Sequence, residues 1–315
     1  MFEIFKSEIK EGLSATPKTL PSKYFYNKKG DALFTEIMDL PEYYLTRSEL
    51  DIFQNKTQEL IDAFNINPET NFELIELGAG DGLKTKELLK FLLKKDYKFE
   101  YMPVDISSNA LNLLEQDLAT ELPSLTVKTQ HGDYFEILNS LKGDNIRKIV
   151  LFLGSNIGNM TDNIATQFIY DLGATLQKDD ILLLGVDLIK PKEIVLPAYN
   201  DSKGVTAQFN LNLLERINNE LGGGFELENF KHHPEYDEEE GIAKSFIVST
   251  SNQKVEIKEL GITYEFVSGE KIHTEISRKY NDQLIEKITS KTDFSLKTKI
   301  MDSKEYFADY ILERK

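Results

Sequence analysis

The chain has 315 residues and a mass of 36.1 kDa, which is enough for one large domain or for a domain that carries a second lobe. Its formal net charge is −16 at pH 7, spread along most of the chain, so nucleic acid and anionic membranes are poor partners. It contains no cysteine, which excludes thiol nucleophiles, disulfides and cysteine metal sites.

We expect neither a metal site nor a membrane segment. Of the four histidines only His232 and His233 are close in sequence, and adjacent residues rarely ligate one metal from a regular element. Residues 1–10 alternate apolar and charged side chains and lack the apolar core of a signal peptide. No stretch approaches the roughly 20 apolar residues that a membrane span needs. The sequence therefore predicts a cytoplasmic protein.

Strands and helices alternate from about residue 72, after an N-terminal segment (1–50) with two short helical patterns. Apolar runs predict five strands, at 72–77, 99–104, 125–127, 149–153 and 181–186. The segments between them suit right-handed crossovers and predict a doubly wound parallel sheet. A strand-like run at 306–312 could return to the edge of this sheet.

The regular alternation weakens after residue 190. Apolar residues at helical spacing predict a helix over 206–221, which three successive glycines end. Residues 225–275 read as several β segments, and the acidic run 237–240 between them reads as a solvated loop.

A glycine-rich turn follows the first of the five strands, where the sequence reads Glu76-Leu-Gly78-Ala-Gly80-Asp-Gly82. Ligands of open α/β sheets bind beyond the carboxyl ends of the strands, and glycine lets a ligand approach the backbone closely. Asp105 ends the next strand and can accept hydrogen bonds from both hydroxyls of a ribose. The glycine spacing is tighter than the dinucleotide fingerprint and resembles motif I of methyltransferases.

Asp133 and Tyr134 form a third part of this pattern, just past the third predicted strand. In methyltransferases an acidic residue here receives the adenine amino group, and an aromatic neighbour lies beside the ring. The alternative is that Asp133 only caps a helix. Three parts in the right order favour a site for S-adenosylmethionine (SAM).

With further motifs the chain resembles the ergothioneine-pathway L-histidine Nα-methyltransferase family. The resemblance spans residues 24–280. It is carried by Tyr26-Asn27, by the run from Leu40 to Arg47 (LPEYYLTR), by 152–159 (FLGSNIGN), by 199–201 (YND), by 204–210 (GVTAQFN) and by 274–277 (TEIS).

This resemblance implies an α/β fold: a Rossmann-like class I methyltransferase sheet with a second α+β lobe that closes over the substrate. The SAM-binding domain would cover 51–190 and be completed by about 280–315. The substrate-binding lobe would be built from 1–50 and 191–279. The implied reaction is SAM-dependent Nα-methylation of L-histidine to the trimethylated betaine hercynine. The expected partner is this small amino acid, and we expect a monomer.

The resemblance also implies the site residues. The cofactor contacts would be Tyr26, Gly78, Lys84, Asp105, Asp133 and Tyr134. The substrate contacts would be Tyr43, Asn159, Tyr199, Glu275 and Ser277. Tyr43 and Asn159 would orient the reacting amine and so act as the catalytic pair.

The chemistry of these side chains suits the implied roles. Phenol hydroxyls donate to a carboxylate, and an amide can hold both an amine and a carboxylate oxygen. Glu275 and Ser277 lie two residues apart, so on a strand both point to the same face, where they could grip the two nitrogens of an imidazole. Read alone, Tyr43 is more simply a half-buried residue beside a proline turn, and Lys84 a solvated helix residue; together, at matching positions, the functional roles are favoured.

One position departs from the family. Ser245 stands where histidine-specific members commonly carry a methionine near the substrate side chain. An N-methyltransferase that acts on another amino acid or small amine therefore remains an alternative. A SAM-binding regulator without activity and a nucleic-acid methyltransferase are further alternatives. The polar set facing the substrate argues against the first, and the charge of −16 argues against the second.

Overall fold

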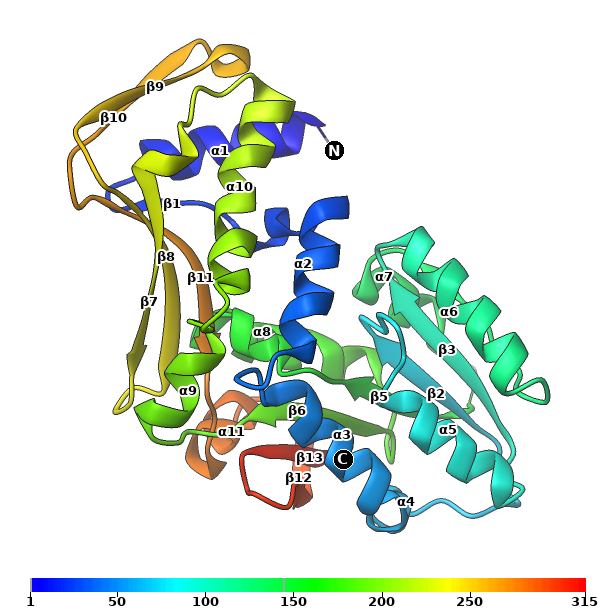
Figure 1. Cartoon of the computed structure of the whole chain (residues 1–315). Coiled ribbons are helices and arrows are strands. Elements are labelled where there is room, and N and C mark those ends of the chain that lie inside the picture. The colour runs from blue at the N-terminus through cyan, green and yellow to red at the C-terminus, as the bar shows by residue number, and fades with distance from the viewer. Residues whose placement is uncertain (1, 144) are drawn as a thin grey trace. The chain divides into compact units, whose positions relative to one another are not determined.

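The computed structural model describes residues 2–143 and 145–315, which form two compact units (Figure 1). Unit 1 consists of Met1–Tyr44 and Lys190–Ser277, and unit 2 of Leu45–Ile189 and Arg278–Lys315. Each unit is therefore built from two separate stretches of sequence. Each also has apolar clusters of its own.

Unit 2 contains a seven-stranded sheet in the order β12-β13-β6-β5-β2-β3-β4. The strands from β2 to β6 pair in parallel, whereas β13 is antiparallel to both β6 and β12. Continuous apolar runs form 149–152 of β5 and 181–184 of β6, because helices cover both faces of these central strands. The strands are β2 (Phe72–Leu77), β3 (Phe99–Asp105), β4 (Gln130–His131), β5 (Arg147–Phe152), β6 (Ile181–Asp187), β12 (Phe294–Met301) and β13 (Phe307–Arg314).

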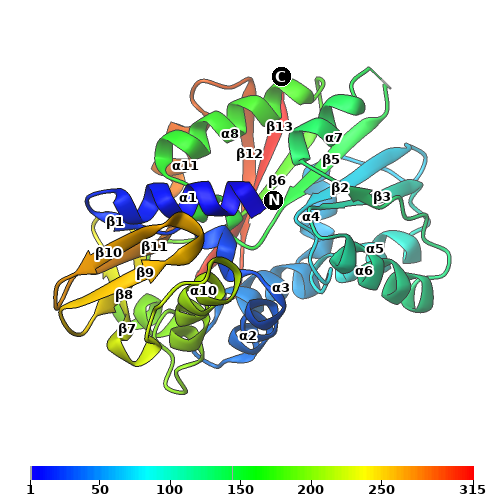
Figure 2. The same ribbon diagram turned by 90° about the horizontal axis from the view of Figure 1, so that it is seen from above.

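Helices cover the two faces of this sheet, with α5 and α6 on one side and α8 and α11 on the other (Figure 2). The first face is covered by α3 (Leu45–Asn55), α4 (Thr57–Phe64), α5 (Thr85–Lys94) and α6 (Ser108–Glu121). The second is covered by α7 (Tyr134–Ser140), α8 (Asp162–Thr175) and α11 (Asp282–Thr289), and the short helix η2 (Asn156–Asn159) follows β5.

Unit 1 combines a four-stranded sheet, in the order β1-β11-β8-β7, with the hairpin β9–β10. Its strands are β1 (Lys18–Thr19), β7 (Phe230–Asp237), β8 (Ile242–Ser249), β9 (Gln253–Ile257), β10 (Ile262–Phe266) and β11 (Lys271–Arg278). Its helices are α1 (Phe2–Ser14), α2 (Lys28–Asp39), α9 (Lys192–Ala198) and α10 (Val205–Leu221), with short turns η1 (Ser22–Phe25), η3 (Leu227–Asn229) and η4 (Lys258–Leu260).

The core of unit 1 is organised around α10. Phe209, Leu213 and Ile217 recur on one side of the helix and are buried together with apolar residues of α1, α2 and the strands. Gly222 ends the helix with φ +61°, the left-handed conformation that glycine adopts without a steric penalty.

The α/β class, the class I sheet and the second α+β unit agree with the prediction, but three details of the sheet were wrong. Leu125–Val127 forms no strand; Val127 makes only an isolated bridge to Tyr101, and the strand beside β3 is Gln130–His131. The run 306–312 does not lie at the edge, because β13 inserts between β6 and β12. The sheet is accordingly mixed rather than wholly parallel.

Within the acidic run 237–240, Asp237 ends β7 and 238–240 form a turn; all four residues are exposed, as predicted. Within residues 2–143 and 145–315, no three or more histidine or acidic side chains are grouped as metal ligands. No helix in the same part of the chain is both long and apolar enough to cross a membrane.

Candidate active site

The glycine-rich turn leaves the carboxyl end of β2 with an open backbone surface. Gly78 donates its N–H to the Val104 carbonyl over 2.8 Å and has φ +74°. A Cβ at this position would lie 2.9 Å from the Tyr134 hydroxyl, so only glycine lets this tyrosine approach. Gly80 has φ +55°, and no atom lies within 4 Å of the place its Cβ would take. The turn is thus a cradle for a ligand that contacts the backbone.

Asp105 and Tyr134 lie beside this cradle. One oxygen of Asp105 accepts the N–H of Ser107 at 2.8 Å, and the other is 3.4 Å from the Gly80 nitrogen. Burial raises the pKa of Tyr134 to about 12, and the carboxylates of Asp105 and Asp133 add to this rise. Asp105, Asp133 and Tyr134, three of the predicted cofactor residues, therefore influence one another electrostatically beside Gly78.

Asp133 is the N-cap of α7. Its Oδ1 accepts the N–H groups of Phe135 and Glu136, at 2.9 and 3.3 Å. Asp133 therefore does cap a helix, as the alternative interpretation predicted. Both bonds use Oδ1, and within residues 2–143 and 145–315 no group donates to Oδ2, so capping does not exclude adenine recognition by the exposed side of the carboxylate.

Lys84 is not a solvated helix residue. It precedes α5, and its ammonium forms an ion pair with the carboxylate of Glu49, which is fully buried. Burial alone would lower the pKa of Lys84, but the negative charge of Glu49 raises it overall. Lys84 therefore stays charged at the start of the helix, where a ligand carboxylate would also be favoured by the helix dipole.

Glu76 connects the cofactor turn to the neighbouring elements. It is buried and accepts hydrogen bonds from Thr85 Oγ1, at 2.8 Å, and from the Tyr101 hydroxyl. Burial raises the pKa of Glu76 to about 7. The side chain joins the end of β2 to the start of α5 and to β3. Thr85, the first residue of α5, is buried and commits its hydroxyl to this bond.

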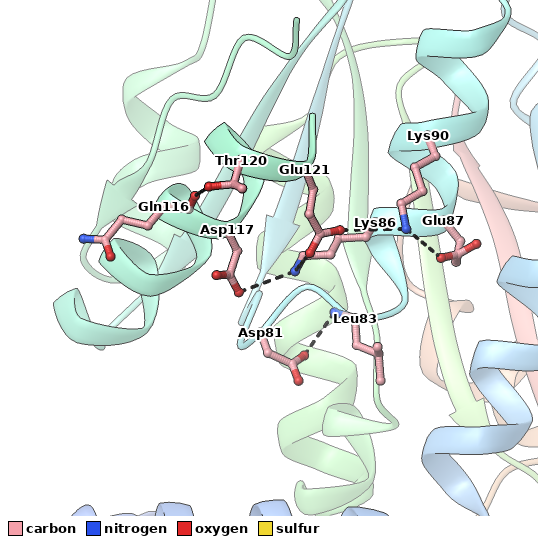
Figure 3. A network of polar contacts seen from close by, with 9 residues as sticks. All are labelled: Asp81, Leu83, Lys86, Glu87, Lys90, Gln116, Asp117, Thr120 and Glu121. Carbon is pink, nitrogen blue, oxygen red and sulfur yellow. Dashed lines mark hydrogen bonds and ion pairs between the residues drawn. The ribbon is translucent and has the colours of Figure 1, made fainter. Parts of the chain in front are cut away.

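A network of polar contacts holds α5 against α6 (Figure 3). Lys86 pairs with Glu121 and Asp117 of α6, at 3.1 and 3.6 Å, and Lys90 reaches Glu121 at 3.9 Å and Glu87 of its own helix at 3.2 Å. Pairs of this exposed kind contribute about 0.5 kcal/mol each. Their main effect is to fix the direction in which the helix leaves the cofactor turn.

Asn159 ends the short helix η2 after β5, and its side chain is exposed. Ser155 precedes the helix and accepts the Asp187 N–H at 3.0 Å. A Cβ at Gly158 would lie 2.7 Å from the Arg278 carbonyl, so the helix packs closely on that backbone. These contacts give Asn159 a defined place in unit 2.

Four predicted substrate residues belong to unit 1, and two of them are directly bonded. The Tyr199 hydroxyl donates to Ser277 Oγ over 2.8 Å, and both residues are buried. Glu275 lies on the same strand, β11, two residues before Ser277. Because side chains alternate between the faces of a strand, both belong to one face. Ser245 of β8 approaches Glu275 Oε2 to 3.4 Å.

The aromatic residues Tyr26 and Tyr43 are linked through Phe34, whose ring centroid lies 5.6 Å from Tyr26 and 6.2 Å from Tyr43. Tyr26 is 45% exposed, yet its surroundings desolvate the hydroxyl and raise its pKa, and the Glu275 carboxylate adds to the rise. Tyr43 is half-buried in this aromatic group. Within unit 1 the structure thus brings Tyr26 near Glu275.

Unit 2 contains Gly78, Lys84, Asp105, Asp133, Tyr134 and Asn159, and unit 1 contains Tyr26, Tyr43, Tyr199, Glu275 and Ser277. The first set suits SAM, on three observations. The glycine turn is open to a ligand, the half-buried Asp105 carboxylate can accept ribose hydroxyls, and the Lys84 ammonium has donors beyond the one given to Glu49.

Comparison with known proteins decides the family. A family model described as "Histidine-specific methyltransferase, SAM-dependent" matches residues 5–314. The chain belongs to this family. The match confirms the predicted family, the methyltransferase activity and the use of SAM.

Relatives of this methyltransferase include the histidine N-alpha-methyltransferase of Mycolicibacterium smegmatis, which is 34% identical over 281 residues, or 89% of this chain and 86% of the relative. Ergothioneine biosynthesis protein 1 of Schizosaccharomyces pombe is 29% identical over 94% of this chain, which spans only 39% of that longer protein. Among solved structures, magnesium protoporphyrin IX methyltransferase from Synechocystis with bound SAH is 14% identical, with a TM-score of 0.48, and the match covers 93% of this chain and 98% of that one.

Sequence reasoning missed three side chains that shape the methyltransferase site: Glu49, Glu76 as a bonded group, and Asp309. A signal for Glu49 was present, because it interrupts the apolar stripe of α3 that includes Leu45, Ile52 and Phe53. Asp309 likewise interrupts the apolar run of β13. A carboxylate on a buried face needs a partner, and this rule would have marked both residues.

Proposed function

We propose that this methyltransferase transfers methyl groups from SAM to the α-amino nitrogen of L-histidine and forms hercynine by successive transfers. The observation that carries the proposal is the polar set at β11, where the buried Ser277 is bonded to Tyr199 and the half-buried Glu275 lies beside Ser245 of β8. A carboxylate and a hydroxyl on one face of a strand match the two ring nitrogens of an imidazole.

SAM supplies a methyl group on a sulfonium, which is already activated for displacement by an amine. The residues of this chain therefore contribute mainly by positioning, since the geometry of attack decides the rate. Tyr43 and Asn159 would orient the amine, and Tyr199 would hold the α-carboxylate. The α-ammonium must first lose a proton, and water would accept it, because none of the proposed contacts is a dedicated base.

The proposed contacts distribute two roles between the units. Unit 2 would bind SAM through Gly78, Lys84, Asp105, Asp133 and Tyr134, with Tyr26 of unit 1 as a further contact. Unit 1 would form the substrate-binding lobe. We also retain the expectation of a monomeric, cytoplasmic enzyme, which sedimentation and cell fractionation would test.

The test is a substrate screen. Purified protein is incubated with SAM and each proteinogenic amino acid, and methylated products are detected by mass. We expect histidine to be turned over in preference to all others, with mono-, di- and trimethylated products appearing in order. Release of S-adenosylhomocysteine (SAH) at background level with histidine would refute the proposal.

A second candidate substrate class rests on Ser245. This serine is 1% exposed and touches Glu275, so a small side chain stands where the family commonly has a methionine. The space could admit an amino acid with a larger side chain than histidine. Preferred turnover of such an amino acid in the same screen would establish this alternative.

A further inference from the structure

Three ionisable side chains converge in unit 2 below the cofactor turn. Glu49 of α3 and Asp309 of β13 are both fully buried, and Lys84 forms an ion pair with Glu49. Gly185 of β6 lies opposite Asp309 in the register of the sheet. A Cβ at Gly185 would collide with Glu49 Oε1 and lie 3.0 Å from Asp309 Oδ1, so the two carboxyl groups meet where glycine leaves room.

Glu49 connects two loops that border the cofactor site. Both of its oxygens accept the Gly154 N–H, at 3.0 and 2.9 Å, and one also accepts from the Lys84 ammonium. A Cβ at Gly154 would lie 3.5 Å from Lys84 Nζ and 3.7 Å from Asn156 Nδ2. The side-chain nitrogen Nδ2 of Asn156 would also lie 3.7 Å from a Cβ at Gly78. Glu49 thus anchors the start of α5 and the loop after β5 to one carboxylate.

Asp309 completes this arrangement. Neither of its oxygens accepts a hydrogen bond from residues 2–143 or 145–315. Burial raises the pKa of Asp309 well above its ordinary value, and the charge of Glu49 raises it further, which favours the neutral form of this carboxyl group. A neutral carboxyl carries a proton that it can donate. Glu49 Oε1 and Asp309 Oδ1 both border the place of a Gly185 Cβ, so a proton on Asp309 can face Glu49.

We propose that Glu49 is a positioning residue for the amino-acid end of SAM, which it serves by holding Lys84 and the Gly154 amide in place, and that Asp309 orients Glu49. A lysine ammonium has three donors. One is committed to Glu49, and the remaining two can face the methionine carboxylate. This inference rests on the proposed contact between Lys84 and the cofactor.

The test compares two ligands by calorimetry. SAH carries the amino-acid end, whereas 5′-methylthioadenosine retains the nucleoside and sulfur and lacks it. We expect Glu49→Gln to weaken SAH binding about tenfold, because a lysine that loses a charge-assisted bond is no longer held, and to change methylthioadenosine binding less than about twofold. The KM for SAM should rise with little change in kcat at saturation.

Glu121→Gln is the matched control, because it also removes a carboxylate that pairs with a lysine of α5, Lys86, at 3.1 Å. We expect it to change neither affinity. Asp309→Val removes the donor and should weaken SAH alone by about threefold, whereas Asp309→Asn keeps a donor and should restore binding. These two variants leave Glu49 intact and test the inference even if Glu49→Gln does not fold.

If Glu49→Gln weakens the binding of SAH and of methylthioadenosine equally, the role of Glu49 is merely structural and the inference is overturned. Unchanged affinity for both ligands would overturn it as well. Lys84→Met separates this failure from that of the proposed cofactor contact. If Lys84→Met leaves SAH affinity unchanged, the contact itself is wrong and the inference falls with it. If Lys84→Met weakens the binding of SAH but not of methylthioadenosine, while Glu49→Gln changes neither, the contact of Lys84 with the cofactor stands. Only the positioning role of Glu49 is then overturned.

Discussion

The hydroxyl of Tyr199 donates a hydrogen bond to Ser277 Oγ over 2.8 Å, and both side chains are buried in unit 1. Tyr199 follows α9, whereas Ser277 lies near the end of β11, so the bond joins a helix end to a strand. His232 Nε2 lies 2.8 Å from the Tyr199 carbonyl and fixes the backbone at the same point.

Because the two hydroxyls act as one unit, we predict that Tyr199→Phe and Ser277→Ala are not additive. Each change should raise the KM for histidine, and the double variant should exceed the worse single one only slightly. The expected coupling is about 1 kcal/mol, which is typical of one hydrogen bond. Steady-state kinetics on the four proteins of the cycle measure it, and additive effects on KM would contradict the prediction.

Glu275 should contribute much more to substrate binding than Ser245. We predict that Glu275→Ala raises the KM for histidine by about 30-fold or more, since a charged acceptor for a ring N–H is lost, with SAM affinity nearly unchanged. Ser245→Ala is the matched control. It removes only a long contact of 3.4 Å to Glu275 and should change KM less than about threefold. Unchanged histidine kinetics for Glu275→Ala would refute the ring-binding role.

Two glycines of the cofactor turn separate backbone strain from steric collision. Gly78→Ala places a Cβ 2.9 Å from the Tyr134 hydroxyl at φ +74°, whereas Gly80→Ala has a similar φ of +55° and no atom within 4 Å. We expect both to lose about 1 kcal/mol of unfolding free energy from the left-handed backbone. Only Gly78→Ala should also displace Tyr134, so its SAM affinity should fall further. Equal SAM affinities, measured by calorimetry, would contradict this assignment.

Glu76 should make the stability of the protein depend on pH. Burial raises its pKa from 4.5 to about 7, so between these values the folded state holds a proton that the unfolded state has lost. Stability therefore falls as the pH rises through this window, by up to about 3 kcal/mol. Glu76→Gln imitates the neutral form and should lack this decline.

Urea unfolding from pH 4.5 to 8 measures the difference between the two proteins. We expect the free energy of unfolding of the wild type to decrease relative to Glu76→Gln as the pH rises. Curves that run parallel over the whole range would show that Glu76 does not titrate in this window.

The sequence predicted those parts of the fold that depend on local patterns. The apolar run 72–77 and the glycines after it predicted β2 and its turn, and helical spacing predicted α10 from 206 to 221. Leu125–Val127 runs beside β3 but pairs with it only through the Val127–Tyr101 bridge, and the continuous pairing that defines β4 begins at Gln130. The place of β13 in the middle of the sheet depends on contacts between residues far apart in sequence, which no local pattern carries.

The candidate site shows the same division. Gly78, Asp105 and Asp133 follow strands and could be predicted from that position, because the carboxyl ends of parallel strands share one edge of a sheet. The partners of Lys84 could not, since Glu49 lies 35 residues earlier in the chain. The predicted contacts of the substrate residues stay predictions that the proposed variants test.

The insertion of β13 between β6 and β12 also affects how the chain folds during synthesis. Until residues 307–314 leave the ribosome, β6 presents an unpaired apolar edge, and both apolar clusters of unit 2 lack the residues that β13 supplies. The nascent chain must therefore keep this edge from pairing with other chains from the synthesis of β6 until β13 has emerged. Chaperone capture of nascent chains stalled between β6 and β13 should consequently exceed that of chains stalled after β13 has emerged.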